Sequence, residues 1–326
     1  MSIVVTVYNG GPHFPTCFAS LCKLSYPADR LEIHLVDDCS MDGTREFLQG
    51  QSAPDFLHLH FPDTNLGRTR ACNLALAQTT GEVVIFLDGD MEVQPDFVDQ
   101  HLAELAKPGR EAVVGLVKPA AWIPRTKLNR YMYDYSRRGA RQFGPDTPID
   151  FQYLAFNNAA LSHAAVDSGG LFEESFRHFG GKDILFAYRL AQRFPRGIYY
   201  SDKPVAYHHH DRSLGTYMAL LRQYGYYNLP QIISQHPELA TILAADYAWP
   251  LPGNHFRYKR MAGKVLFSRV IRSIIRGLLI VTPSPLSGML VRFLLVSAVV
   301  QGLRKHVREH RVEPKHSPKH PDRPKR

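Results

Sequence analysis

Residues 82–90 constrain this chain more than any other stretch, because an apolar run there ends abruptly in two carboxylates. Residues 83–87 are uniformly apolar and partly β-branched, which is typical of a strand buried on both faces. Asp88 and Asp90 follow, separated by Gly89. A strand that ends this way places hard oxygen ligands where open α/β sheets bind their ligands. Such carboxylates suit Mg²⁺ or Mn²⁺ shared with substrate phosphates, and Gly89 would let a diphosphate approach closely.

The same Asp-Gly pair is also a common turn signal, so the metal interpretation depends on the rest of the chain. Strands are expected at residues 3–7, 31–36, 56–61, 83–87 and 112–117. Helices are expected at residues 14–23, 44–49, 68–77 and 95–106, with Pro95 at a first helical position. This alternation predicts an α/β fold with a mostly parallel sheet and helices on both faces.

Residues 118–150 interrupt the alternation with arginines interleaved with aromatic side chains. One interpretation is a solvated, partly helical excursion. The other is a surface that faces an acceptor or a phosphate, because arginine forks match phosphates and aromatic rings stack on flat ligands.

The four cysteines have no metal-site spacing and are expected to be reduced thiols. The first residues resemble a strand rather than a signal peptide.

The charge is distributed unevenly along the chain. The net charge is +9, yet residues 254–326 contain 17 Lys/Arg against 3 Asp/Glu, so the preceding residues carry a slight acidic excess. This asymmetry predicts a polyanionic partner, and an anionic membrane surface is favoured because no motif supports nucleic acid. The predicted organisation is a catalytic-type domain over residues 1–215, a helical extension over 216–253, membrane-associating helices over 254–303 and a disordered basic tail over 304–326.

The C-terminal helices are the basis of the membrane prediction. Over residues 259–277, Lys264, Arg269, Arg272 and Arg276 fall on one side of a helical wheel and Phe267 with several aliphatic residues falls on the other. Residues 286–303 are long and apolar enough for one membrane span. A span would put the two basic flanks on opposite sides, so helices lying in the cytoplasmic leaflet are preferred to it, and a soluble appendage packed on the core is the third interpretation.

Four separated blocks carry a family resemblance. They are residues 4–9 (VVTVYN), 36–44 (VDDCSMDGT), 65–73 (NLGRTRACN) and the Asp-Gly-Asp of residues 88–90. With these blocks in this order, the chain resembles family 2 glycosyltransferases, which are inverting enzymes of the GT-A fold. The resemblance implies a mixed GT-A sheet over about residues 1–215 and a divalent metal cofactor, Mn²⁺ or Mg²⁺.

The resemblance also implies roles for individual residues. Thr6, Tyr8 and Asp38 would line the nucleotide-base pocket, and Arg68 or Arg70 would reach the nucleotide. The alternative roles are packing at a strand end for Tyr8 and turn capping for Asp38. Asp88 would contact the ribose or a metal-bound water, and Asp90 would bind the metal directly.

In the second half the resemblance implies the catalytic base and a third metal ligand. Asp183 stands where the family carries the Asp of a Glu-Asp pair, but Lys182 replaces the usual Glu. His208 follows the last core segment as a metal-ligating histidine does in many GT-A enzymes, and His210 would point to the same side of an extended segment. The alternatives are that Asp183 only caps its helix and that the histidine run is a surface tract.

The implied function is inverting, metal-dependent transfer of a sugar from a nucleotide-diphosphate sugar to a cell-envelope glycan or lipid-linked acceptor. The expected location is the cytoplasmic face of the cell membrane, with peripheral or monotopic attachment. Two rivals remain open. One is a sugar-nucleotide nucleotidyltransferase, but such enzymes usually carry a glycine-rich, basic first loop, whereas residues 8–12 are brief and lack Lys/Arg. The other is a non-catalytic binding protein, for which Lys182 is the best argument.

Overall fold

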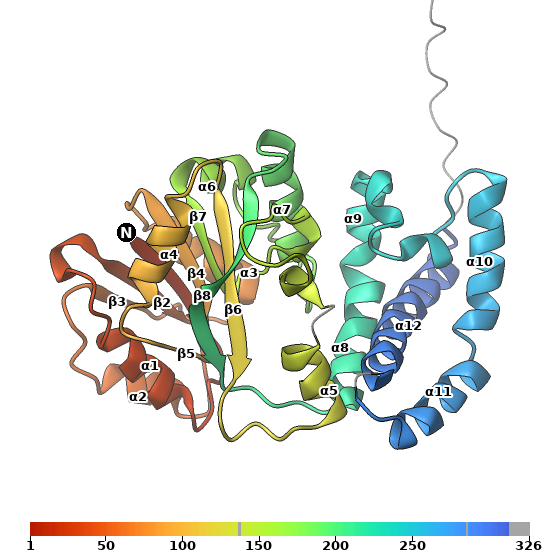
Figure 1. The fold of residues 1–326 in the computed structure, drawn as a ribbon, viewed down its shortest axis with the longest axis horizontal. Helices are drawn as coiled ribbons and strands as arrows, with labels where there is room; N and C mark the ends of the chain where they lie inside the picture. The colour runs from red at the N-terminus through yellow and green to blue at the C-terminus, as the bar shows by residue number, and fades with distance from the viewer. Residues whose placement is uncertain (136–137, 285, 313–326) are drawn as a thin grey trace, which may run out of the picture. The chain divides into compact units, whose positions relative to one another are not determined.

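The computed structural model describes residues 1–312 apart from 136, 137 and 285. The chain forms two compact units (Figure 1). The first unit comprises Met1–Arg177 and Lys182–Arg212, and the second comprises His178–Gly181 and the residues from Ser213 onward.

The first unit is built on an eight-stranded mixed sheet with the strand order β3-β2-β1-β4-β7-β6-β8-β5. Its strands are β1 (Ser2–Val7), β2 (Glu32–Asp37), β3 (Leu57–His60), β4 (Val83–Asp88), β5 (Met91–Val93), β6 (Ala112–Pro119), β7 (Asn158–Ser162) and β8 (Ile198–His208). Strands β1 to β4 pair in parallel, β7 is antiparallel to both β4 and β6, and β8 is parallel to β6 and antiparallel to β5. The predicted α/β class with a mixed sheet is therefore confirmed.

The helices of the first unit also follow the predicted alternation. They are α1 (Phe14–Cys22), α2 (Thr44–Gln49), α3 (Arg68–Leu76), α4 (Phe97–Leu105), α5 (Lys127–Asn129), α6 (His163–Gly169) and α7 (Lys182–Arg193), with short helical turns η1 (Ala28–Arg30), η2 (Arg130–Asp134), η3 (Gly139–Phe143) and η4 (Phe151–Tyr153). Helix α4 begins at Phe97 rather than at the predicted Pro95, because the Pro95 carbonyl accepts hydrogen bonds from the backbone and side chain of Ser25 instead.

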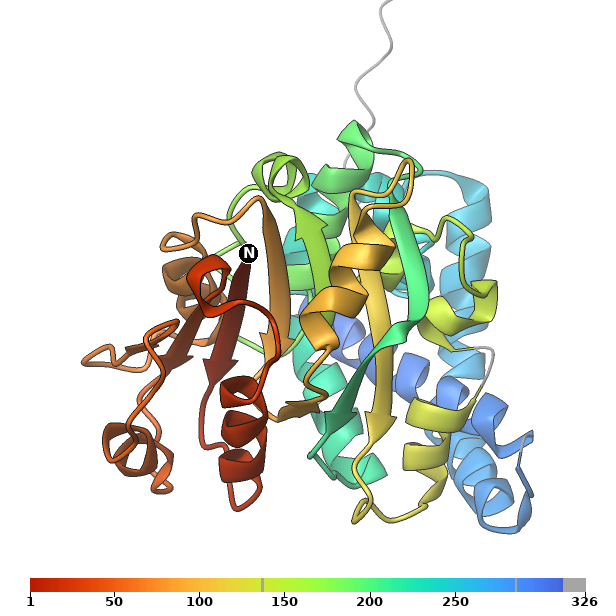
Figure 2. The same cartoon turned by 60° about the vertical axis from the view of Figure 1, so that its left-hand side comes forward.

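Two apolar cores, one on each face of the sheet, explain the uniformly apolar strand β4. Val4 and Phe86 belong to the core that α3, α6 and α7 cover. Ile3 and Ile85 belong to the core that α1, α2 and α4 cover (Figure 2). Because successive side chains of a strand point to opposite faces, a strand with both faces covered has no solvent-facing position.

The second unit is helical. Its elements are α8 (Leu214–Tyr227), α9 (Leu229–Gln235), η5 (Pro237–Ala240), η6 (Ala245–Tyr247), α10 (Asn254–Leu266), α11 (Arg269–Val281) and α12 (Leu286–Glu309). Helix α12 packs closely against α8 where two glycines face the opposite backbone. A Cβ atom on Gly302 would lie 2.1 Å from the Arg222 carbonyl oxygen, and one on Gly225 would lie 2.1 Å from the Val299 carbonyl oxygen.

The C-terminal helices differ from the prediction in three details. The amphipathic stretch over residues 259–277 is broken between α10 and α11, where the Ser268 hydroxyl caps α11 by accepting a hydrogen bond from the Ile271 amide. Phe267, expected on the apolar face of that stretch, instead follows the last residue of α10 and is buried against Tyr247 and Phe293. Helix α12 continues to Glu309, so the first part of the predicted tail is helical, and residues 313–326 lie outside the described residues.

Within the described residues, α12 is the one helix that is long and apolar enough to cross a membrane. Its most apolar 18-residue window is 56% buried inside the structure. This burial and the close packing on α8 give α12 a structural role within the second unit.

Candidate functional site

A pocket of about 400 Å³ lies in the first unit, where the carboxyl ends of β1, β2 and β4 meet. The predicted donor-binding residues all line it, namely Thr6, Tyr8, Asp38, Arg68 and Asp88. They come together because parallel strands present their carboxyl ends at one edge of a sheet. Tyr8 is half exposed there, with its ring free to meet a ligand.

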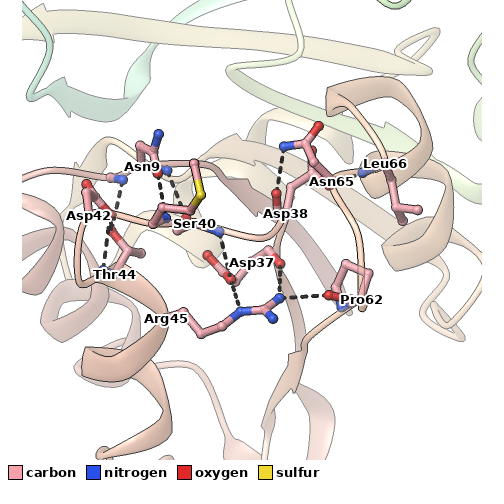
Figure 3. Close-up of polar contacts among 12 residues, drawn as sticks. Asn9, Asp37, Asp38, Ser40, Asp42, Thr44, Arg45, Pro62, Asn65 and Leu66 are labelled. Atoms are coloured by element: carbon pink, nitrogen blue, oxygen red, sulfur yellow. Dashed lines mark hydrogen bonds and ion pairs between the residues drawn. The ribbon is translucent and has the colours of Figure 1, made fainter.

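A network of short polar contacts shapes the loop after β2 (Figure 3). Asp37 is fully buried, accepts a hydrogen bond from the Ser40 amide and pairs with Arg45 Nε at 2.7 Å. The turn-capping role considered for Asp38 therefore belongs to Asp37. Asp42 caps the start of α2 by accepting from the Thr44 amide, as its Asp-Gly turn signal predicts.

Asp38 instead holds the neighbouring loop. Its two carboxylate oxygens accept hydrogen bonds from the backbone amides of Leu66 at 2.6 Å and Gly67 at 3.0 Å. Its carbonyl accepts from Asn65 Nδ2 at 2.8 Å (Figure 3). Burial nevertheless raises the pKa of Asp38 above its ordinary value. Each carboxylate oxygen retains a further acceptor site that could receive an N–H group of a ligand.

Gly89 lines the pocket and is also required for the packing of the strand ends, in addition to the expected approach of a diphosphate. Its amide donates to the Thr6 carbonyl at 3.1 Å, and a Cβ atom at this position would lie 2.8 Å from Val7 Cβ. The chain after β4 therefore packs directly onto the end of β1, which leaves no space for a side chain.

Asp88 and Arg68 form an ion pair at the pocket wall. The pKa of the Arg68 guanidinium is raised. Desolvation acts to lower it, but the negative charges of Asp88, Asp183 and Asp90 outweigh this effect. Arg68 therefore links the strand-end acids to Asp183 electrostatically. Arg70, the alternative considered, points to Glu174, with 3.2 Å between Nε and the carboxylate oxygen.

Asp90, His208 and His210 form a group of potential metal ligands. Asp90 Oδ2 lies 3.1 Å from His208 Nε2 and 3.5 Å from His210 Nδ1, and the two imidazole rings stack with their centroids 5.6 Å apart. Asp90 Oδ1 is buried without a hydrogen-bond partner among the described residues. Burial acts to raise the pKa of Asp90, but hydrogen bonds from the two histidines outweigh it and hold this pKa well below its usual range. One carboxylate and two imidazoles within reach of one point suit a divalent ion such as Mn²⁺.

The cluster differs from the predicted ligand set in two members. His210 joins it, since residues i and i+2 of an extended segment point to the same side. Asp88 does not belong to it in the described structure, because its carboxylate turns toward Arg68.

Three side chains from residues 118–134 hold the histidine run in place. Tyr133 Oη lies 2.8 Å from His208 Nδ1, Trp122 Nε1 donates to His209 Nδ1 at 3.1 Å, and Asn129 Nδ2 donates to Asp211 Oδ1 at 2.8 Å. Neither interpretation of this segment anticipated these contacts. The interleaved aromatic residues were the available signal, but sequence alone did not indicate what they touch.

Asp183 lies in the first turn of α7 and does not line the pocket described above. Its Oδ1 atom is buried without a hydrogen-bond partner among the described residues. Lys182 Nζ lies 4.0 Å from that oxygen and 5.0 Å from the centre of the Phe172 ring. The lysine ammonium is thus accommodated on an aromatic face beside the acid.

Solved structures with the same architecture define the fold class. The mannosyltransferase PcManGT from Pyrobaculum calidifontis, in complex with GDP-Man and Mn²⁺, aligns with a TM-score of 0.60 and 20% identity over 92% of this chain and 86% of that one. TarS 1–349 from Staphylococcus aureus, in complex with UDP-GlcNAc, aligns with a TM-score of 0.53 and 18% identity over 95% of this chain and 91% of that one. The first unit is therefore a GT-A fold, as the resemblance implied.

The sequence comparison identifies the family. The profile of Glycosyl transferase family 2 matches residues 2–164, half of the chain, and the chain belongs to this family. Glycosyltransferase AglE of Haloferax volcanii is 29% identical over 119 residues, which is 36% of this chain and 39% of AglE. Hyaluronan synthase of Pasteurella multocida is 24% identical over 244 residues, which is 64% of this chain and 24% of the synthase. The matched segments thus span well under half of these relatives.

Proposed function

We propose that this protein transfers a sugar from a nucleotide-diphosphate sugar to an acceptor, with inversion at the anomeric carbon and with a divalent metal ion, Mn²⁺ or Mg²⁺. The observation that carries the proposal is one pocket at the ends of parallel strands, lined by the predicted donor-binding residues together with Asp90 and His210 of the Asp90–His208–His210 cluster. Family membership and the nucleotide-sugar complexes of structures with the same fold support it.

In this proposal different residues of the pocket bind different parts of the donor. Tyr8 stacks on the nucleotide base, while Thr6 and Asp38 contact its edge. Arg68 binds the diphosphate, for which its guanidinium must turn from Asp88, and Asp88 is then free to meet the ribose or a metal-bound water. An arginine fork suits phosphate oxygens.

Asp90 and His208 hold the metal ion in this proposal, and the position of His210 beside Asp90 supports it as a further ligand. When bound, the ion neutralises the charge that develops on the departing diphosphate. The buried, unpartnered Asp90 Oδ1 is the best evidence that this cluster is built for a cation. A carboxylate oxygen withdrawn from water and left without a donor is otherwise costly.

Asp183 is the proposed general base. It removes the proton of the acceptor hydroxyl while that oxygen attacks the anomeric carbon from the face opposite the diphosphate. Its Oδ1 receives no hydrogen bond from the described residues, so no internal donor competes with the acceptor hydroxyl for it. Lys182 lies beside it, where the family usually carries an acid.

The proposed acceptor is a cell-envelope glycan or a lipid-linked acceptor, met at the cytoplasmic face of the cell membrane. Sequence relatives are named for hyaluronan and for poly(ribitol-phosphate), which are polymeric acceptors or products. The exposed apolar side chains of α10 and α11, among them Val265, Val270 and Ile274, support peripheral attachment.

The decisive experiment is a mass-spectrometric screen of nucleotide sugars incubated with the full chain, with Mn²⁺ or with a chelator. Metal-dependent release of nucleoside diphosphate from one donor supports the proposal, and NMR of the anomeric proton of the first product tests inversion. Release of inorganic diphosphate from a nucleoside triphosphate and a sugar phosphate would instead identify the nucleotidyltransferase rival. Donor binding with no turnover for any acceptor fraction would identify the binding protein.

A further inference from the structure

The second unit contains a large basic cavity that the proposed transfer reaction does not use. Its volume is about 840 Å³, and it is bounded by α10, the start of α11 and the last turns of α12. Seven basic side chains line it, namely Arg257, Arg260 and Lys264 from α10, Arg272 from α11, and Arg304, Lys305 and Arg308 from α12. The lining contains no carboxylate. The three helices belong to one compact unit (Figure 1). The cavity is therefore a feature of that unit alone.

The positive charge of this cavity is not neutralised within the described part of the chain. None of the seven side chains takes part in an ion pair there, whereas the nearby Lys259 is paired with Asp246 at 2.7 Å. Among the described residues, the Arg272 guanidinium donates to the Phe267 carbonyl at 2.5 Å and the Arg304 guanidinium to the Tyr247 carbonyl at 3.4 Å, both neutral acceptors. Converging cations with no counter-charge repel one another, so an anion that entered the cavity would be bound favourably.

The electrostatics of the two central arginines agree with this geometry. Desolvation, followed by the charges of neighbouring arginines, lowers the pKa of both Arg272 and Arg304. Guanidinium groups held close together in partial burial match the several oxygens of a phosphate or diphosphate, which accept paired N–H bonds.

The surface beside the cavity indicates where such a phosphate comes from. Tyr258, Met261 and Val265 form one exposed apolar stripe of α10, at spacings of three and four residues. Met261 also lines the cavity, so the apolar stripe and the basic lining are continuous. Val270, Ile274 and Leu278 form a similar exposed stripe on α11. Apolar stripes beside basic side chains are typical of helices that lie in a membrane interface.

We propose that this cavity is a binding site for the phosphate-bearing headgroup of a membrane lipid, with the apolar stripes of α10 and α11 in contact with the acyl chains. The site does not depend on the proposed sugar transfer, because it uses none of the residues of the first unit. It makes membrane attachment selective for phosphorylated headgroups rather than merely attracted to negative charge.

The test compares two double variants of the full chain that lose the same charge. Arg272→Gln with Arg304→Gln removes two cavity residues, and Arg269→Gln with Arg276→Gln removes two arginines of α11 that do not line the cavity. Flotation with phosphatidylcholine vesicles that contain phosphatidic acid should show about thirtyfold weaker binding for the cavity variant and a change within about threefold for the control. Circular dichroism verifies that both variants are folded.

Four outcomes would overturn the proposal. Equal losses in the two variants would mean diffuse attraction to the surface, and unchanged binding in both would mean that the cavity is not used. Calorimetry with water-soluble short-chain phosphatidic acid and with inorganic diphosphate separates the two sources of phosphate. Tighter binding of the short-chain lipid supports a lipid site, whereas equal or tighter binding of diphosphate would identify a site for soluble phosphates. Binding of single-stranded RNA, but of no vesicle, would likewise replace the lipid with a nucleic acid.

Discussion

Tyr133 Oη lies 2.8 Å from Nδ1 of His208, and the other ring nitrogen of His208 faces Asp90 at 3.1 Å. A neutral imidazole carries one proton, and a nitrogen that binds a cation must be the one without it. If Nε2 of His208 is a ligand, Nδ1 therefore carries the proton and donates it to the Tyr133 oxygen. This contact would fix both the tautomer and the orientation of the ring.

Tyr133→Phe should therefore weaken Mn²⁺ binding by about 10- to 100-fold, the usual effect of losing a hydrogen bond behind a metal ligand. Calorimetry, or electron paramagnetic resonance of free Mn²⁺, measures this without relying on activity. The control is Tyr135→Phe, in the same segment. In the described structure the Tyr135 hydroxyl contacts neither His208 nor Asp90, so its loss should leave the Mn²⁺ affinity unchanged. Equal affinities for the Tyr133→Phe variant and the wild type would mean that His208 is not oriented in this way.

The sequence predicted the parts of the site that depend on strand ends and missed those that depend on tertiary packing. The sequence could assign three residues to the site, Thr6, Asp38 and Asp88, because each lies at or just after the end of a recognisable strand. Parallel strands bring these ends together at one edge of the sheet. Tyr133 reaches His208 across 75 positions of the chain from a short irregular helix, and no local pattern encodes that contact. Gly89 could be recognised as necessary, but its contact with Val7, a second reason for a glycine there, could be seen only once the strands were paired.

Asp183→Asn should reduce turnover by about 10²- to 10⁴-fold, because it removes a general base while conserving the shape of the side chain. Donor and metal affinities should stay unchanged, since Asp183 does not line the donor pocket. Steady-state kinetics combined with donor titration separates the two effects. Asp202→Asn, at an exposed position of β8, is the matched control and should be fully active. Full turnover in Asp183→Asn would remove Asp183 from the mechanism and leave it a helix-capping acid.

Gly302→Ala should destabilise the second unit by roughly 1–3 kcal/mol, the usual cost of overpacking. The new Cβ atom would lie 2.1 Å from the Arg222 carbonyl oxygen, so α8 and α12 would have to separate. Gly277→Ala is the control, because a Cβ atom at this position of α11 meets nothing within 4 Å. Since alanine favours a helix over glycine, this control should be neutral or slightly stabilising. Chemical denaturation measures both changes, and equal midpoints for the two variants would contradict the close crossing of α8 and α12.

His101 should make the stability of the first unit depend on pH between about 6.5 and 4. Its ring is fully buried, Nε2 donates to Asn158 Oδ1 at 2.8 Å, and burial lowers its pKa from 6.5 to about 4 although Asn158 and Glu104 act in the opposite direction. The unfolded chain takes up this proton below pH 6.5 but the folded chain only near pH 4, so the stability is complete above pH 6.5 and falls as the pH is lowered through this window. The loss should reach about 3 kcal/mol, at 1.36 kcal/mol for each pH unit between the two pKa values.

The His101→Gln variant has no titrating group at this position. Its denaturation midpoint should therefore fall less steeply with acid than that of the wild type. Identical slopes for the two proteins would mean that His101 is already protonated in the folded state or remains accessible to solvent.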